Sequence, residues 1–589
     1  MTIMRHGARK GTSLIDLLMS IAIVAVLFGG IYLIYFSIIT SISNISVRTA
    51  AASAISAEIE TIRNLPYDQV GTIGGVPSGV IPQGQTMTVG PYTFNLFTTI
   101  RNIDDPFDGT VNGTPADTAP ADYKLVSIEA TCPLCTNNVS VTVTTTAAPK
   151  ALESATQNGS LFLYAIDANG IGVPGATVHV VNSAVSPTID LTDTTNASGS
   201  LQLVGVPTST QGYQIFVSKP GYSSEQTYPV GAAGNPNPVL PNATVAAQTV
   251  TSVTFAIDRT SSLTIHTTDD RCNAMSGVPL SIAGGKLIGT SPDVLKFSTT
   301  TTTNASGLSL FGSLEWDTYA ITMTDGTKDI QGTTPLVPLT INPSTTVDLY
   351  YTLRSAADPS LLVTPIDATT GQVVPGGTMR ISKTGYSAAQ TAGHSFVTNT
   401  DWSGGNYAVQ SGGIDANSAP GSISLMINAS GTYDTGVTQW LESNTIDLGG
   451  TSTAFYTISW NPVSEPLNTT LEFQVAANND NATWNFVGPD GTAATYFATP
   501  SSSMPSFTGN RYLRYKAYLS TNDSSTTPTL DDITFEFTGD CVPQAQSLFT
   551  GLPTGTYTVI VDAPNYAEGS STVSVGTGEA TTTVLMTHV

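Results

Sequence analysis

The sequence Arg9-Lys10-Gly11-Thr12-Ser13-Leu14-Ile15-Asp16 decides how this chain is organised, because an apolar run from Leu17 to Ile39 follows it directly. A short basic leader ends at Gly11, and the fifth residue after that glycine is acidic. Ordinary signal peptides carry a small-residue cleavage site after their apolar core. Here the candidate site precedes the core, so we expect the apolar helix to remain in the processed chain.

This layout resembles the class III leader of type IV pilins and pseudopilins, usually written as Gly, an apolar residue and then Thr-Leu-Ile-Glu. The resemblance implies that a prepilin peptidase removes the leader, residues 1–11, after Gly11 and methylates the new amino group of Thr12. The chain departs from the pattern at Thr12 (usually Phe), Ser13 (usually Thr) and Asp16 (usually Glu). These departures are more typical of a minor pilin or a pseudopilin than of a major pilin.

The acidic residue Asp16 has a physical reason to be functional. A lone carboxylate in hydrocarbon costs about 3 kcal/mol, so an intramembrane acid indicates a function and a partner. In the family's assembly model that partner is the α-amino group of a neighbouring pilin subunit. The alternative is a plain signal anchor in which Asp16 lies among the lipid headgroups.

The charges around the apolar run predict its orientation. Arg5, Arg9 and Lys10 precede the run, and no charge follows it until Arg48. The positive-inside rule therefore keeps the N-terminus cytoplasmic and exports the rest, which predicts a single-pass protein of the inner membrane with an extracellular bulk. The net charge of −23 argues against nucleic acid as a partner, because nucleic-acid binding needs a basic surface.

Residues 12–65 are predicted to form one long helix, half in lipid and half packed on a globular head, which is the shared design of pilins. Pro66 ends it, because the residue before proline disfavours the helical conformation. Gly29 and Gly30 are the weak spot, since each glycine costs up to about 1 kcal/mol in a helix. The pair is either a point where the helix unwinds in a filament or a point of close helix–helix approach.

Residues 66–150 are predicted to form the pilin head. Alternating apolar residues predict strands that pack on the helix as an antiparallel sheet, at 85–89, 91–100, 123–130 and 139–146. An acidic loop with Asp104, Asp105 and Asp108 offers hard oxygen ligands for Ca²⁺, with ordinary solvated turns as the alternative. No other cofactor is expected.

The chain has four cysteines, of which Cys132 and Cys135 form a CxxC motif between two predicted strands. Such a motif serves as a zinc half-site, a redox centre or a local disulfide. Zinc usually needs a second pair, and the thioredoxin-like βαβ context is missing, so in an exported protein a turn disulfide is the preferred interpretation. Cys272 and Cys541 are a second possible pair that sequence does not settle.

An internal repeat follows, with segments at 155–257, 260–353 and a split copy at 358–408 plus 541–587. Its copies share a set of turn motifs: Val173-Pro-Gly-Ala, Thr195-Asn-Ala-Ser-Gly199, Thr303-Asn-Ala-Ser-Gly307, Thr400-Asp-Trp-Ser-Gly404 and Gly555-Thr-Tyr-Thr-Val. Short alternating strands joined by such turns predict β-sandwiches. The motifs resemble the carboxypeptidase regulatory-like, transthyretin-like sandwich, and this resemblance implies spacers or stalks and no peptidase activity.

Residues 412–540 are predicted to be an insertion into the third sandwich. Runs such as Trp484-Asn-Phe-Val-Gly-Pro-Asp-Gly491 and Arg511-Tyr-Leu-Arg-Tyr-Lys-Ala-Tyr518 resemble the galactose-binding-like, discoidin-type jelly roll. Trp440, Trp484, Arg511 and Arg514 are the candidate glycan-binding residues. The alternative places such tryptophans in the core.

The chain is therefore expected to be a long helix with a small antiparallel sheet, followed by an all-β body of tandem sandwiches with an inserted jelly roll. The five histidines are scattered without catalytic spacing, so no enzyme is expected. The first hypothesis is a minor type IV pilin, at the tip of a filament or sparse along it, that displays its sandwiches for adhesion to a glycan or protein. The alternatives are an anchored surface spacer without filament assembly and a secretion pseudopilin that selects cargo.

Overall fold

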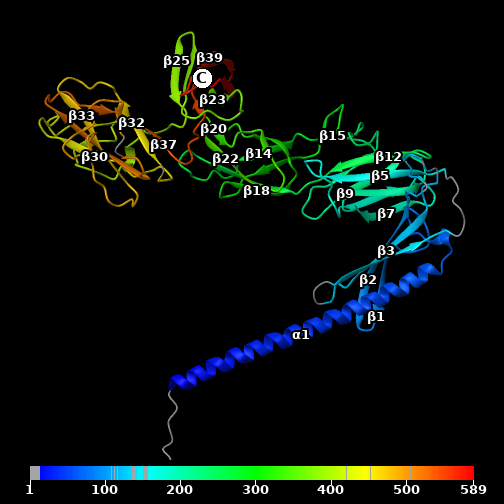
Figure 1. The fold of residues 1–589 in the computed structure, drawn as a ribbon. Helices are drawn as coiled ribbons and strands as arrows, with labels where there is room; N and C mark the ends of the chain where they lie inside the picture. The colour runs from blue at the N-terminus through cyan, green and yellow to red at the C-terminus, as the bar shows by residue number, and fades with distance from the viewer. Residues whose placement is uncertain are drawn as a thin grey trace, which may run out of the picture. The chain divides into compact units, whose positions relative to one another are not determined.

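The computed structural model describes residues 14–107, 109–111, 113–115, 117, 119–135, 139–149, 157–418, 421–451, 453–504 and 507–589. One long N-terminal helix precedes an all-β body rich in sandwiches, as the sequence predicts (Figure 1). The chain forms two compact units. The first runs up to Arg259 and includes Leu287–Val294, and the second comprises Thr260–Lys286 and Leu295–Val589.

Helix α1 (Leu14–Arg63) has two different halves. Its C-terminal half buries a stripe at helical spacing, formed by Val47, Ala51, Ala54, Ile55 and Ile62. The helix ends just before Pro66, where the Leu65 amide donates to the Ile62 carbonyl at 3.1 Å. Its N-terminal half extends beyond the sheet that covers the other half (Figure 1). The helix passes through Gly29 and Gly30 without a break, so unwinding there stays a prediction about the assembled state.

The head sheet is an antiparallel meander of four strands packed on α1: β1 (Gly84–Val89), β2 (Tyr92–Ile103), β3 (Tyr123–Thr131) and β4 (Ser140–Ala147). Alternation places Phe94, Leu96 and Ile128 against the helix. Lys124 joins the short 3₁₀ helix η1 (Tyr67–Gln69) to β3, since its Nζ donates to the Tyr67 carbonyl at 2.7 Å. Burial lowers the pKa of Lys124, and nearby Asp68 opposes that shift.

The first sandwich pairs a sheet in the order β10-β9-β6-β7, with β11 on β9, and a sheet in the order β12-β5-β8. Its strands are β5 (Gly159–Ile166), β6 (Thr177–Asn182), β7 (Ile189–Thr194), β8 (Ser200–Val206), β9 (Ser209–Ser218), β10 (Glu225–Gln226), β11 (Ala243–Val245) and β12 (Val250–Ala256). The Asn-Ala-Ser-Gly motif is a turn, as predicted, because the Asn196 side-chain oxygen accepts the amides of Ser198 and Ser200, each at 3.0 Å. Gly199 has a φ of +75°, and a Cβ there would lie 2.5 Å from the Val173 amide, so only glycine fits.

Within the first unit, the head is fixed to the first sandwich by polar contacts. The Arg101 guanidinium of β2 donates two hydrogen bonds to the buried Asp193 carboxylate of β7, and the distance from Nε to Oδ2 is 2.6 Å. Asn102 donates its Nδ2 to the Val204 carbonyl at 2.8 Å. A two-nitrogen arginine–carboxylate contact fixes orientation as well as distance, so these two modules meet in one defined geometry.

The second sandwich has sheets in the orders β18-β13-β22-β20 and β17-β14-β19-β21. The strands in this part of the chain are β13 (Ser261–Thr268), β14 (Pro279–Gly284), β15 (Leu287–Gly289), β16 (Val294–Leu295), β17 (Ser298–Thr302), β18 (Leu308–Leu314), β19 (Asp317–Met323), β20 (Lys328–Thr334), β21 (Leu339–Ile341) and β22 (Thr346–Ser355). Asn304 and Gly307 repeat the turn of the first sandwich, because Asn304 accepts the amides of Ser306 and Leu308.

The third sandwich is split in sequence, with β23-β24-β25 before the insertion and β38 to β41 after it. Its sheets have the orders β38-β23-β41 and β25-β24-β39-β40. Its strands are β23 (Ser360–Asp367), β24 (Thr378–Lys383), β25 (Tyr386–Thr391), β38 (Ser547–Phe549), β39 (Gly555–Asp562), β40 (Gly569–Val575) and β41 (Glu579–Met586). The parallel pairing of β23 with β41 closes the module across the insertion.

The inserted jelly roll packs two main sheets, ordered β26-β37-β32-β34 and β27-β30-β35-β31 with β33 on β35, around one core, and a small sheet β28-β29-β36 adds to them. Its elements are β26 (Ser395–Asn399), η2 (Ser403–Gly405), β27 (Val409–Gln410), β28 (Ile414–Asp415), β29 (Ile423–Leu425), β30 (Gln439–Glu442), β31 (Ile446–Asp447), β32 (Ala454–Asn461), β33 (Thr469–Asn478), β34 (Ser502–Ser503), β35 (Tyr512–Thr521), β36 (Thr529–Leu530) and β37 (Asp532–Thr538).

The jelly roll begins earlier than the predicted boundary at residue 412. Strand β26 pairs with β37 across the whole of Ser395–Asn399, and Trp402 lies fully buried in the jelly-roll core. The Thr400–Gly404 stretch copies the repeat's turn motif, and this pattern predicts that it belongs to the third sandwich. Strand pairing instead places it in the insertion, so the first part of the third sandwich ends before Ser395.

A buried carboxylate at the contact between the second and third sandwiches gives a testable dependence of stability on pH. Glu579 Oε2 accepts the Ile330 amide at 3.0 Å. Burial raises the pKa of Glu579 to about 7, and the neighbouring acids Asp329 and Asp358 push it the same way. The folded protein therefore holds this proton more tightly than the unfolded chain, whose pKa is 4.5. The contribution of Glu579 to the free energy of unfolding is therefore fully present below pH 4.5, and it is lost as the pH rises through about 7.

We expect the urea midpoint of the second unit to fall between pH 5 and pH 8. The loss is on the order of 1–2 kcal/mol once solvent screening is allowed for. Glu579→Gln is expected to flatten this dependence, and Glu568→Gln, at an exposed position in the same sandwich, to leave it unchanged. An equally steep profile in Glu579→Gln would contradict the assignment.

Candidate functional site

The N-terminal half of α1 is the first candidate site. The large apolar side chains from Leu18 to Ile45 are 47–75% exposed, and they point in every direction around the helix. A helix that is apolar on all faces is stable in a membrane or in the interior of an assembly. Within the described part of the chain, this is the one helix long and apolar enough to cross a bilayer.

The leader residues Gly11 and Thr12 lie outside the described residues. Asp16 falls in the first turn of α1, immediately before the exposed apolar segment. Cleavage after Gly11, methylation of Thr12 and the assembly role of Asp16 therefore stay predictions from the sequence.

The acidic loop uses its carboxylates to hold its own backbone. Asp104 Oδ2 accepts the Val111 amide at 2.9 Å, and Asp105 Oδ1 accepts the Phe107 amide at 3.1 Å. Asp108 lies outside the described residues. Among the residues that the structure does describe, no group of three or more His, Cys, Asp or Glu side chains is arranged to hold a metal ion. Calcium binding here stays a prediction.

All four cysteines are paired. Cys132 and Cys135 form a disulfide in the turn between β3 and β4, with their Cα atoms 5.3 Å apart. Cys272 and Cys541 form the second, also with a Cα separation of 5.3 Å. This second bond joins the turn after β13 in the second sandwich to the segment that leaves the jelly roll.

The structure brings three of the four candidate glycan-binding residues onto one sheet face of the jelly roll. Lys516 of β35 lies 3.6 Å from the Trp440 ring, and Arg514 lies 4.5 Å from the Trp484 ring. Arg514 also pairs with Glu442 at 2.8 Å. Arg511, the fourth residue, pairs instead with Asp447 at 2.8 Å near the end of the same strand.

The strand registers explain this arrangement. In β35 alternate residues point outward, and Trp440 lies opposite Tyr518 while Gln474 lies opposite Lys516. Tyr518 donates its hydroxyl to Gln474 Oε1 at 2.9 Å, and burial raises the pKa of Tyr518 to about 12. Burial lowers the pKa of Lys516. The cations therefore stack on the aromatic rings of the same face. These contacts hold the 484–497 loop against the sheet.

The tryptophans of the jelly roll divide between core and surface. Trp402 and Trp460 are buried in the core, while Trp440 and Trp484 are half-buried on the outward sheet face. The rings of the second pair are already stacked on cations. Glycan binding by this face therefore stays a prediction, with a structural role as its competitor.

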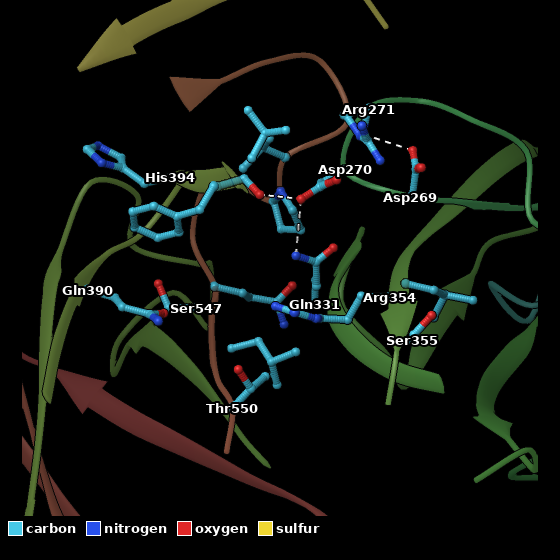
Figure 2. Close-up of a pocket in the computed structure, with 18 of the residues that line it drawn as sticks. Asp269, Asp270, Arg271, Gln331, Arg354, Ser355, Gln390, His394, Ser547 and Thr550 are labelled. Carbon is cyan, nitrogen blue, oxygen red and sulfur yellow. Dashed lines mark hydrogen bonds between the residues drawn. The ribbon is translucent and has the colours of Figure 1, made fainter. Parts of the chain in front are cut away.

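A polar cavity of about 520 Å³ in the second unit was not predicted (Figure 2). The second sandwich lines it through Asp269–Arg271, Gln331 and Arg354. The third sandwich contributes Gln390, Ser547 and Thr550, and the jelly roll contributes β26. Single-sequence reasoning missed it because its residues span from Asp269 to Thr550 and carry no shared motif. The suspected Cys272–Cys541 pair was the one sequence signal that pointed to this region.

Comparisons with known proteins give limited matches. No family model matches the chain. A stretch of 188 residues is 31% identical to S-layer protein B of Acidianus ambivalens, covering 31% of this chain and 31% of that protein. The match thus spans about a third of that curated relative.

Solved structures resemble the chain only weakly. The Bacillus anthracis TIE protein is 11% identical with a TM-score of 0.16, covering 86% of this chain and 73% of its own. GBS52, the minor pilin of Streptococcus agalactiae, is 13% identical with a TM-score of 0.18, covering 33% and 96%. These TM-scores are too low to support an argument about function.

Proposed function

We propose that this chain is a membrane-anchored surface protein of the type IV pilin-like class, a minor pilin or pseudopilin that displays β-modules for adhesion. The two halves of α1 carry the proposal. One half is apolar and exposed on every face, and the other half is packed under a four-stranded head sheet. A helix built in this way joins a lipid-embedded segment to a folded domain without a hinge.

Processing of the leader would place two charged groups, an α-amino group and a carboxylate, at the start of the helix. Cleavage after Gly11 followed by methylation would create a methylated α-amino group on Thr12. This group would lie four positions before Asp16 in the sequence. A carboxylate in hydrocarbon needs a partner. The α-amino group of a neighbouring subunit supplies one and couples helix packing to correct placement in an assembly.

Three further features support display outside the cell. The chain carries charges on only 11% of its residues and has a net charge of −23. Both cysteine pairs form disulfides, which persist in oxidising compartments. Part of the chain is similar to an S-layer protein. The anchored spacer without assembly and the pseudopilin that selects cargo remain the competing functions.

An Asp16→Asn variant separates assembly from anchoring. Asparagine keeps the shape of the side chain but removes its charge, so we expect normal membrane insertion and at least about a tenfold drop of the protein in sheared filaments. Tenfold corresponds to about 1.4 kcal/mol, less than the carboxylate's insertion cost of about 3 kcal/mol. Quantitative immunoblots of sheared and membrane fractions measure this.

The matched control is Asp562→Asn, which removes one exposed aspartate from the third sandwich. It is expected to behave as the unmodified chain. Equal amounts of Asp16→Asn and unmodified protein in the sheared fraction would reject the assembly role. Absence of the unmodified protein from that fraction would favour the anchored spacer.

A further inference from the structure

The cavity at the junction of the second sandwich, the third sandwich and the jelly roll is lined by acids that are hydrogen-bonded within the protein and by other polar groups that are not. Its carboxylates are already occupied. Asp269 Oδ1 accepts the amides of Arg271 and Asn273, and its Oδ2 accepts Asn273 Nδ2. Asp270 Oδ2 accepts the Ser395 hydroxyl and Gln331 Nε2 (Figure 2). These acids therefore hold the loop and the neighbouring strands in place.

The histidine at the cavity wall is occupied too. His394 Nδ1 lies 2.8 Å from Glu536 Oε1, and the imidazole stacks on the Tyr456 ring with centroids 3.7 Å apart. The His394 pairing also lowers the pKa of Glu536, so that carboxylate is engaged as well. The acidic groups around the cavity are thus hydrogen-bonded within the protein, and Arg271 and Arg354 line the cavity beside Asp269 and Asp270.

Several donors and acceptors remain unused. Arg354 is an exposed residue at the cavity, and its guanidinium makes no ion pair or side-chain hydrogen bond with any described residue, although the chain has 43 acidic and only 20 basic residues. Gln331 Oε1 is buried without a hydrogen-bond partner. Figure 2 labels Arg354 and Gln331 among the lining side chains, and the two residues come from the paired strands β22 and β20. A buried acceptor without a partner destabilises the folded protein, so a bound group that donates a hydrogen bond to it would remove this penalty.

Hydroxyl and amide groups of the third sandwich also line the cavity. The side chains of Gln390, Ser547 and Thr550 line the cavity and form no hydrogen bond within the described part of the chain. Phe396, at the start of β26, lines it as well and is 47% exposed. Free donors and acceptors beside an accessible aromatic ring match the alternating hydroxyls and apolar faces of a sugar. Arginine recognises a carboxylate with two parallel hydrogen bonds.

We infer that this cavity is a binding site for an acidic saccharide, with a uronic-acid carboxylate on Arg354 and neighbouring sugar hydroxyls on Gln331, Gln390 and Ser547. Its volume of about 520 Å³ lies within the range of ordinary small-molecule sites. A saccharide with few carboxylates fits better than a polyanion, because the chain as a whole is strongly negative. The inference rests on the proposed function, in which these modules face the outside of the cell.

The Cys272–Cys541 disulfide holds two walls of the site together. Cys272 follows Arg271, and Cys541 precedes Val542 and Pro543, which line the cavity from the other side. Reduction of this bond releases the restraint between the walls. We therefore expect reduction to weaken saccharide binding, without any change in the groups that contact the ligand.

The test is calorimetric titration of the full-length chain in detergent micelles with a galacturonic acid trisaccharide, and with a neutral galactose trisaccharide as the comparison ligand. The acidic ligand is expected to bind at least about tenfold more tightly than the neutral one. Arg354→Ala should weaken acidic-ligand binding by about 10- to 100-fold, because charged hydrogen bonds contribute roughly 1.5–3 kcal/mol. Gln331→Met is expected to weaken binding of both ligands.

Arg380→Ala is the matched control, since Arg380 is an exposed arginine of β24 outside the cavity. It should bind as the unmodified chain does. Equal binding of the two trisaccharides, equal effects of Arg354→Ala and Arg380→Ala, or no binding at millimolar ligand would each overturn the inference. Because the titration uses purified chain, failure of leader processing or assembly would leave its result unchanged.

Discussion

Replacing Gly11 with valine is expected to block leader removal completely. In the resemblance to type IV pilins the peptidase cuts after this glycine, and valine places a branched side chain next to the bond that is cut. The membrane-bound chain should then retain residues 1–11, including Arg5, Arg9 and Lys10. Without a free amino group on Thr12, Asp16 would lack the assembly partner that we propose for it, so the variant should also be absent from sheared filaments.

Gly7→Val is the matched control, because it makes the same substitution four residues earlier in the leader. It is expected to be processed as the unmodified chain is. The measurement is the N-terminal peptide of each variant, recovered from membranes and identified by mass spectrometry. A Gly11→Val chain that begins at Thr12 would show that the cleavage site lies elsewhere or that the enzyme is a different one.

Trp402→Ala is expected to have the largest effect on stability, and it tests where the jelly roll begins. Trp402 is fully buried in the jelly-roll core. Its Nε1 donates to the Tyr515 hydroxyl at 2.6 Å, and Asn399 Nδ2 donates to the same oxygen at 2.8 Å. Truncating a buried tryptophan costs about 3–5 kcal/mol. A loss of that size is a large part of the stability of a single domain.

Tryptophan fluorescence during urea unfolding reports mainly on this module, because Trp402, Trp440, Trp460 and Trp484 all lie in it. Hydrogen exchange then locates the loss. Protection is expected to fall in β35 and β37 and to persist in β39 of the third sandwich. Trp316→Ala, in the second sandwich, is the control and should leave jelly-roll protection unchanged. Loss of protection in β39 with β35 intact would restore the boundary predicted from sequence.

The sequence predicts those structural features that depend on residues close to one another in the chain. The end of α1 follows from Pro66, and the head strands follow from apolar alternation in segments such as Tyr123–Thr131. The turn at Asn196–Gly199 follows from one side chain that accepts two nearby amides and one glycine with a positive φ. Each of these features depends on residues within a few positions of one another.

Features that depend on distant partners were missed. The Thr400–Gly404 stretch has the repeat's turn pattern, but a turn pattern does not specify which module contains it. Pairing of β26 with β37, across more than a hundred residues, decides that question. The polar cavity is hidden for the same reason, since its lining residues Gln331, Phe396 and Ser547 come from three different modules. The surface position of Trp440 and the core position of Trp460 likewise follow from strand register.

We propose above all that the apolar helix remains in the processed protein and begins at a methylated residue. The mature N-terminus of the protein taken from cells tests it directly, by intact mass together with sequencing of the N-terminal peptide. We expect a chain that starts at Thr12 and carries one additional methyl group. A chain that starts at Met1, or one that is cut after the apolar run ending at Ile39, would contradict it.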